Sequence, residues 1–226
     1  MHPPLPFNAR AARALREKLG MAPGHVAYAM RASFDMSYIA PEHVAAWERG
    51  THLPSANELM ALAGALWCHP SELMGRPGTL REHRIARGIS PDDVARGTGL
   101  NIAAYHAMEE TGQWTGDKGQ SLRLGSLLAL PPRDYIAITG LEDELARLLT
   151  EAVSTRWQAH VRAIAKLLSM DRRDLRDPLN AMQHEYQALM AATLSRAGGT
   201  TASGEDGRGY IDDIVNRFWA RLPDHS

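Results

Sequence analysis

The 226-residue chain contains a single cysteine, Cys68. One cysteine excludes an intrachain disulfide and a cysteine-based zinc site, and its neighbours Leu66 and Trp67 indicate a small buried hydrophobe instead. The sequence also lacks an apolar run of the roughly 18 residues that a membrane-spanning helix needs. Its first residues, Met-His-Pro-Pro-Leu-Pro, contain no apolar signal core. We therefore expect a cytoplasmic protein without a membrane segment.

A strong charge of either sign is absent as well. The formal net charge is −1 at pH 7, which is not the basic signature of many nucleic-acid binders. Only three of the 25 basic residues are lysines, a preference for arginine that is typical of high-GC bacterial genomes. With 44% hydrophobic and 23% charged residues, the chain has the composition of an ordinary globular protein with room for one or two domains.

Catalytic motifs are missing from the sequence. It has no glycine-rich phosphate loop, no His-Glu-x-x-His and no Gly-x-Ser-x-Gly. His160, His184 and Glu185 fall on amphipathic segments without metal-ligand spacing. The acid pairs at 92–93 and 212–213 belong in first helical turns, where the helix dipole accounts for them. We expect no enzyme activity, no catalytic residue, no metal and no cofactor.

The stretch around which the rest of the chain is organised runs Ala40-Pro-Glu-His-Val-Ala-Ala-Trp-Glu-Arg-Gly50. Pro41 suits the first turn of a helix, where a missing N–H costs nothing, and Gly50 supplies the stop. Val44 and Trp47 share one face of this helix at i, i+3 spacing. The opposite face presents Glu42, His43 and Ala46.

This one-sided helix is followed by Thr-His-Leu-Pro-Ser and a second apolar helix over 54–66. The combination resembles the recognition helix of Cro/CI-type helix-turn-helix regulators, the lambda-repressor-like or xenobiotic-response-element (XRE) family. The Glu-Arg-Gly ending and the downstream Pro-Ser are typical of that family. The resemblance covers residues 11–75 well and 79–140 more loosely. It implies an all-α, nucleoid-associated protein that binds double-stranded DNA and regulates transcription.

Other helices of this first copy are expected near 11–19, from Pro23 onward, and near 69–73. In the resembled family about four residues join the second and third helices, and the segment 31–39 has roughly seven too many. Phe34, Met36, Tyr38 and Ile39 alternate within that segment. Their alternation predicts an insert that packs down onto the domain.

A second copy of the pattern follows. Gly20-Met-Ala-Pro aligns with Gly88-Ile-Ser-Pro at an offset of 68, and Trp47-Glu48 aligns with Met108-Glu109 at an offset of 61. Ser90 gives the second helix of this copy an N-cap with acidic residues in the first turn. The repeat predicts two small helical domains, within 1–78 and 79–140, the second resembling a degenerate domain retained for structure or dimer contacts.

Candidate DNA contacts in the first copy follow from the resemblance. Glu42 can accept a hydrogen bond from cytosine N4, and His43 can donate one to a purine N7. Ala46 shares their face, and residues expected near phosphates are Arg31, Arg49, Thr51 and His52. The face is poor in Arg, Asn and Gln, so the alternative is a set of ordinary solvent-facing residues.

Candidates in the second copy are Asn101, His106 and Lys118. Asn101 is more simply explained as an N-cap than as a base reader. Trp114, in the glycine-rich loop 112–119, is more simply a packing residue than a stacking platform.

The C-terminal part changes to longer helices. We expect an apolar stripe over 141–168, a charged turn over 171–177, a further helix to 197, a flexible linker over 198–209 and an amphipathic helix within 210–226. The last helix is expected to fold back near Trp157 and Tyr186. Two roles stay open for this region: homodimerisation that places two recognition helices roughly 34 Å apart, or docking of a protein, peptide or small molecule with 210–222 as a movable latch.

The function expected from the sequence is therefore a dimeric, sequence-specific DNA-binding transcriptional regulator that reads DNA mainly with helix 41–49. The alternative is a non-enzymatic interaction scaffold, or a cofactor of transcription, whose repeats kept the fold but no longer read DNA.

Overall fold

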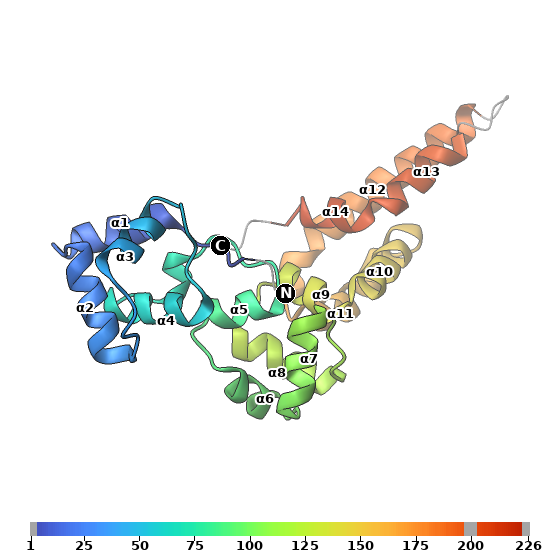
Figure 1. The fold of residues 1–226 in the computed structure, drawn as a ribbon. Coiled ribbons are helices and arrows are strands. Elements are labelled where there is room, and N and C mark those ends of the chain that lie inside the picture. The colour runs from blue at the N-terminus through green and yellow to red at the C-terminus, as the bar shows by residue number, and fades with distance from the viewer. Residues whose placement is uncertain (1–3, 197–202, 223–226) are drawn as a thin grey trace. The chain divides into compact units, whose positions relative to one another are not determined.

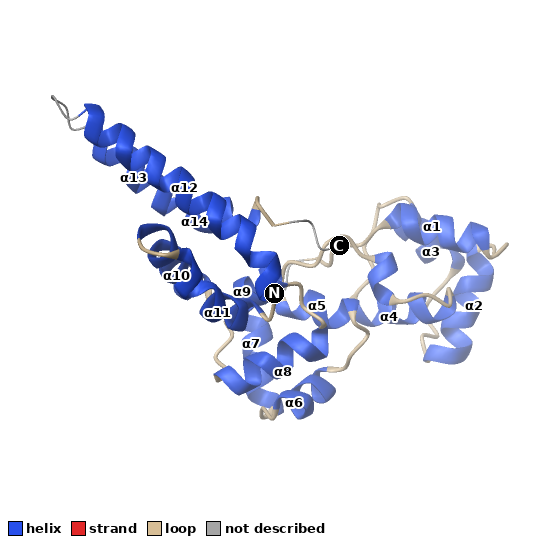
Figure 2. Ribbon diagram, turned by 180° about the vertical axis from the view of Figure 1, so that it is seen from behind, coloured by secondary structure: helices blue, strands red, loops and turns tan. Residues whose placement is uncertain are grey.

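A computed structural model describes residues 4–196 and 203–222 of the chain. Over these residues every regular element is helical, with fourteen α-helices and one 3₁₀ helix (Figure 1, Figure 2). The only extended pairing in this part of the chain is an isolated antiparallel bridge between Phe7 and Met74. The predicted all-α class is confirmed. No helix within the described residues is long and apolar enough to cross a membrane.

The chain divides into two compact units, Met1–Ala129 and Leu130–Ser226. The helices of the first unit are α1 (Ala9–Lys18), α2 (Pro23–Phe34), α3 (Pro41–Glu48), α4 (Ala56–Ala65), the 3₁₀ helix η1 (Pro70–Leu73), α5 (Leu80–Ala86), α6 (Pro91–Thr98), α7 (Ile102–Thr111) and α8 (Lys118–Leu128). Those of the second are α9 (Pro132–Thr139), α10 (Glu142–Ser154), α11 (Trp157–Leu168), α12 (Arg172–Arg196), α13 (Ser203–Asp212) and α14 (Ile214–Trp219). Residues 130–140, which the sequence analysis grouped with the second copy, belong to the second unit.

Local sequence signals explain most helix ends of the first unit. Pro23 and Pro41 occupy the first positions of α2 and α3, as expected. The Ser90 hydroxyl accepts from the Asp93 N–H at 3.2 Å and caps α6. Gly20 and Gly50 follow α1 and α3 with φ of +66° and +70°, which a residue with a Cβ rarely adopts.

The segment 31–39 differs in part from the expected insert. Residues 31–34 extend α2 by a turn, and Asp35 ends the helix in the left-handed region. Ile39 is buried and Met36 is half-buried, but Phe34 and Tyr38 stay 40% and 59% exposed. The expectation that all four pack down was wrong for these two aromatic residues. Phe34 lies on the last turn of the extended α2, and Tyr38 lies in the loop after it, where its hydroxyl donates to Glu58 at 3.2 Å.

The core of the first copy joins α1, α2, α3, α4 and η1. Val44 and Trp47 of α3 are 1% and 3% exposed and pack in the same cluster as Val26 and Met30 of α2. Cys68 packs against this cluster but is half-buried, so its expected full burial was wrong. Its neighbour Trp67 has φ of +55° and is 89% exposed, because the chain turns sharply at the end of α4.

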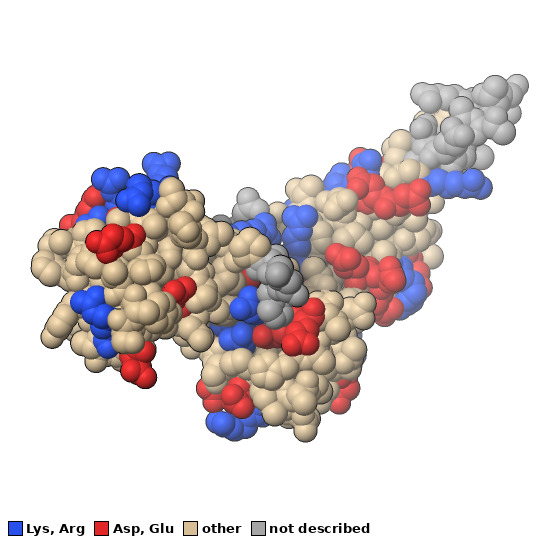
Figure 3. All heavy atoms as spheres, viewed as in Figure 1, with Lys and Arg blue, Asp and Glu red and all other residues tan. Residues whose placement is uncertain are grey.

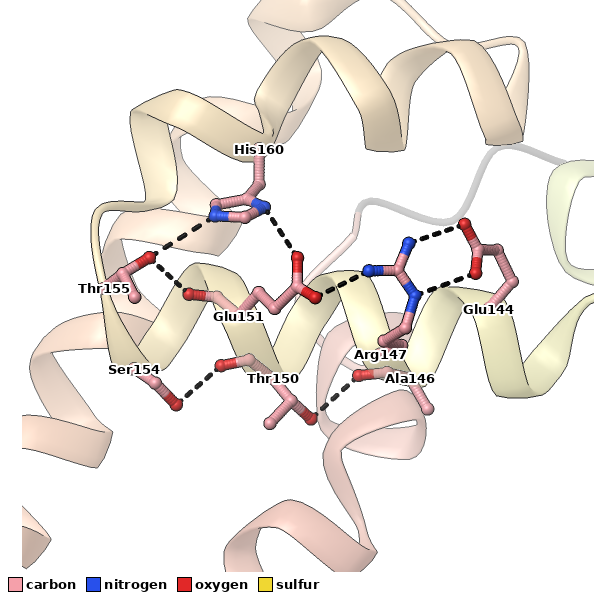
Figure 4. Close-up of polar contacts among 8 residues, drawn as sticks. All are labelled: Glu144, Ala146, Arg147, Thr150, Glu151, Ser154, Thr155 and His160. Carbon is pink, nitrogen blue, oxygen red and sulfur yellow. Dashed lines mark hydrogen bonds and ion pairs between the residues drawn. The ribbon is translucent and has the colours of Figure 1, made fainter.

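In the second unit, the apolar stripe 141–168 is broken into two helices that pack on each other. Thr155 ends α10, and a polar network closes the corner to α11 (Figure 4). The Arg147 guanidinium bridges Glu144 at 2.8 Å and Glu151 at 2.6 Å, while His160 lies 3.5 Å from Glu151 and 3.3 Å from the Thr155 hydroxyl. Folding the stripe in two lets both apolar faces bury each other, which one continuous helix could not do.

Three further expectations for the C-terminal region need correction. The charged segment 171–177 is not a turn, because α12 starts at Arg172 and the Asp171 carboxylate accepts from the Arg173 N–H at 2.8 Å. Residues 203–209 of the expected linker are helical, while 197–202 lie outside the described residues. The last helix is interrupted at Asp213 and becomes α13 and α14.

The expected packing of the last helix onto its own bundle is confirmed. Ile214 and Phe218 are 1% and 0% exposed and join the core cluster of α10, α11 and α12, which Trp157 also contacts. The Tyr210 ring lies 5.6 Å from the ring of Tyr186. Glu185 of α12 contacts Tyr210 of α13, Arg217 of α14 and Arg221, which follows α14.

Candidate nucleic-acid interface

The helix α3 presents two unlike faces. Val44 and Trp47 are buried against α2 and the rest of the first core, whereas Glu42 and His43 are exposed and Ala46 is half-buried. The structure therefore brings together the three residues that the sequence analysis placed on the outer face. An eight-residue helix is about 12 Å long, which fits within one major groove.

A buried ion pair fixes α3 to the start of the domain. Arg16 of α1 donates from Nε and Nη2 to the two carboxylate oxygens of Glu48, at 2.6 and 2.8 Å. The same guanidinium donates from Nη1 to the carbonyl of Met21 at 2.7 Å. The two charged side chains are only 10% and 9% exposed. One side chain thus ties α1, the turn after it and the end of α3 together, and the hydrogen bond to Glu48 raises the pKa of Arg16.

The same contact set recurs in the second copy. Arg84 donates to the two oxygens of Glu109 at 2.6 and 3.0 Å, and to the carbonyl of Ile89 at 3.0 Å. Its members lie 68, 61 and 68 residues after Arg16, Glu48 and Met21, the offsets at which the two copies align in sequence. These side chains are 10% and 5% exposed. We call the two contact sets the arginine clamps.

The second clamp has one additional member. The Tyr105 hydroxyl donates to Glu109 at 2.7 Å, and burial of this side chain raises its pKa, which keeps the hydroxyl protonated. Sequence reasoning aligned Glu48 with Glu109 but singled out neither arginine. The signal was available, because Arg16 and Arg84 align at the offset of their segment.

The candidate phosphate contacts lie at other places on the first copy. Arg31 donates from Nη1 to the carbonyl of Ile39 at 2.6 Å, which anchors the loop before α3. The Thr51 hydroxyl donates to the Ala46 carbonyl at 3.0 Å and thereby caps the C-terminal end of α3. Arg49 and His52 are exposed beside it. Arg31 thus holds the segment before α3, and the other three residues follow its C-terminal end. Arg31 and Thr51 already make hydrogen bonds within the domain.

The second copy offers fewer free groups on the equivalent face. The Asn101 side chain accepts from the Ala103 N–H at 2.8 Å, so its expected N-cap role is confirmed. Trp114 donates from Nε1 to the Ser121 hydroxyl at 2.7 Å and is half-buried, which confirms the packing interpretation. His106 on α7 and Lys118 at the start of α8 are exposed.

Charge is interspersed rather than concentrated. On the face drawn in Figure 3, atoms of both signs lie among a larger uncharged area over the first unit. Among the described residues, no group of three or more His, Cys, Asp or Glu side chains could hold a metal ion. The outer face of α3 offers hydrogen-bonding side chains on an ordered helix.

Comparison of the chain with protein-family models, with curated proteins and with solved structures gives no match. The case for a function consequently rests on the described geometry.

Proposed function

We propose that the protein is a transcriptional regulator that binds double-stranded DNA sequence-specifically and reads it mainly with the helix at 41–49. The observation that carries the proposal is the first arginine clamp, which holds α3 at one end while its outer face stays exposed. A reading helix must be held rigidly because hydrogen bonds to base edges tolerate little displacement. The repetition of the clamp supports an origin of both copies from one helix-turn-helix domain.

We further propose that the protein acts as a homodimer joined through its C-terminal helices. A two-fold arrangement would place two copies of α3 over half-sites roughly 34 Å apart. Because the net charge is only −1, the phosphate contacts of a single copy of the interface supply only part of the affinity that a specific site needs. A homodimer contacts DNA through two interfaces at once, which raises its affinity without additional charge.

Selection from a random pool of duplex DNA with the full-length protein, at moderate salt, tests the proposal. A palindromic motif with half-sites one helical turn apart supports the dimeric regulator. An asymmetric motif supports DNA reading by both copies of one chain and contradicts the dimer. Absence of any enriched motif contradicts the function itself.

A double variant, Glu42→Ala with His43→Ala, tests whether α3 selects the DNA motif. It removes two exposed side chains and the hydrogen bond from the Ala40 N–H to His43, which affects only the first turn of α3. Overall helix content should therefore change little while sequence preference is relaxed or lost. The matched control, Glu142→Ala with His184→Ala, removes the same two exposed residue types from the second unit and should leave the motif intact. Unchanged preference in the first variant would show that α3 does not read DNA.

The dependence of affinity on salt gives an independent measure. A dimer with about six phosphate contacts should show a log–log slope near −5 against salt concentration. A slope near zero would contradict binding along the DNA backbone.

The exposed aromatic residues favour a second candidate function, an interaction scaffold. Trp67 is 89% and Tyr28 is 67% exposed, and large aromatic side chains are enriched in protein interfaces. A scaffold would show only weak, sequence-blind duplex binding at physiological salt, whereas Trp67→Ala would weaken capture of a partner protein. The selection experiment distinguishes the two functions.

A further inference from the structure

The two helices of the proposed reading motif begin with the same four-residue pattern. Ala22-Pro-Gly-His25 opens α2 and Ala40-Pro-Glu-His43 opens α3. In both, the backbone N–H of the alanine donates to Nδ1 of the histidine, at 3.2 and 3.0 Å respectively. Alanine cannot cap a helix with its side chain, and the histidine instead takes the part that glutamate has in a capping box.

This hydrogen bond determines which ring nitrogen carries the proton. A backbone N–H can only donate, so Nδ1 must offer its lone pair, and the proton of the neutral ring then lies on Nε2. Both rings are exposed, and within the described residues neither Nε2 has a hydrogen-bond partner. Each histidine therefore presents a single N–H donor to its surroundings, in a tautomer selected by the fold.

At α3 the residue before this donor is a hydrogen-bond acceptor. Glu42 precedes His43 and is exposed on the outer face. In the major groove, guanine offers the acceptors O6 and N7, whereas cytosine of the same base pair offers the N4 donor. A fixed donor next to a carboxylate is complementary to that pair and is unfavourable where a base amino group would face His43.

We propose that His43 is a specificity-determining residue whose Nε2–H, fixed by the cap from Ala40, selects guanine in each half-site, with Glu42 accepting from cytosine. The proposal rests on the proposed function, because it requires α3 to enter the major groove. His25 has the same cap and belongs to α2, so it serves as the internal comparison.

Two substitutions distinguish the role of His43 as a helix cap from its role as a hydrogen-bond donor to a base. In His43→Gln, the amide oxygen can accept from the Ala40 N–H while the amide nitrogen remains a donor. In His43→Glu, the carboxylate can accept from the same N–H but offers no donor at neutral pH. Both keep a good capping residue at this position, so the helix is preserved and only the reading group changes.

The first measurement is the tautomer in the free protein, by long-range ¹H–¹⁵N NMR at neutral pH. Signals of His25 and His43 are assigned by their loss in His25→Gln and His43→Gln. Both rings should show the Nε2–H tautomer. The Nδ1–H tautomer at His43 would overturn the proposal whether or not the protein binds DNA.

The second measurement is duplex selection with the wild type and three variants. The wild type and His43→Gln should retain guanine at one position of the half-site. His43→Glu should lose that preference by roughly tenfold or more at this position alone. His25→Glu, with the same change of charge, should lower overall affinity but keep guanine.

The outcomes distinguish the two levels of the proposal. A motif from which His43→Glu still selects guanine would overturn the readout while leaving the proposed function intact. If the wild type enriches no motif, the function and the readout both fail, whatever tautomer NMR finds.

Discussion

Removing Glu48 should destabilise the first unit more than removing an exposed charge does. In Glu48→Ala the guanidinium of Arg16, only 10% exposed, loses both oxygens of the Glu48 carboxylate and keeps the Met21 carbonyl. The Glu17 carboxylate, 3.7 Å from Arg16 Nη2, offsets little of this loss, because its side chain is 51% exposed and its charge is screened by solvent. Breaking a buried pair from one side leaves an uncompensated buried charge, which costs about 3–5 kcal/mol. That is a large part of the roughly 5–15 kcal/mol by which a domain is stable.

Urea unfolding, followed by circular dichroism, measures the effect. For a slope near 2 kcal/mol per M, a loss of about 4 kcal/mol lowers the midpoint by about 2 M. Arg96→Ala is the matched control, because its ion pair with Asp93 is 77% and 55% exposed and should contribute less than about 1 kcal/mol. Replacing Arg16 and Glu48 together by methionine should recover much of the loss, since no unpaired charge remains.

A loss below about 1 kcal/mol in Glu48→Ala would refute the reasoning, because it would mean that the pair is solvated in solution. A double variant less stable than Glu48→Ala would refute the charge argument specifically. In that case packing by the arginine stem, rather than its charge, would dominate.

Three further predictions concern other parts of the fold. A Cβ at Gly64 would overlap the Phe34 ring, so Gly64→Ala should destabilise by about 1–3 kcal/mol in thermal unfolding, whereas in a Phe34→Ala background it should stabilise by up to about 1 kcal/mol. Phe218 is fully buried between α14 and its bundle, so Phe218→Ala should cost the second unit about 3–5 kcal/mol in chemical denaturation; an unchanged midpoint would contradict its packing. Burial raises the pKa of Cys68 from 9.0 to about 11, so at pH 8 its alkylation should be roughly 100-fold slower in folded than in urea-unfolded protein, and equal rates would contradict its environment.

The fold class and many helix ends could be predicted because their causes lie within a few residues. Pro41 and Gly50 limit α3 through their own backbone preferences, and Ser90 caps α6 through an N–H three residues away. Such signals depend on local geometry alone, so a single sequence contains them in full.

The breaks at Thr155 and Asp213 could not be predicted, because a continuous apolar stripe fits one helix and two packed helices equally well. Which arrangement forms depends on what the stripe can be buried against. Similarly, Phe34 stays partly exposed because α2 has an extra turn, a choice between helix and insert that apolar spacing alone does not resolve.

The candidate site likewise has features that follow from local sequence and features that depend on distant contacts. Exposure of Glu42 and His43 followed from the buried positions of Val44 and Trp47 on a short helix. The hydrogen bonds of the other candidate residues could not be predicted, because their partners depend on the folded backbone. Arg31, for example, donates to the carbonyl of Ile39. Arg16 and Glu48 are 32 residues apart, and only the repeat connects them to an equivalent pair.

The two copies share the arginine clamp but differ in the side chains that their equivalent helices α3 and α7 present. Both keep a bidentate arginine clamp, although a well-packed apolar replacement for such a pair is often at least as stable. Outside the clamps, the first copy has Glu42 and His43 in the first turn of α3, whereas the second has Ala103 and Ala104 at the positions 61 residues later, in α7. Alanine offers no hydrogen bond to a base edge. The retained clamp and the two alanines together favour a second copy that preserves the fold, with the proposed DNA reading concentrated in the first.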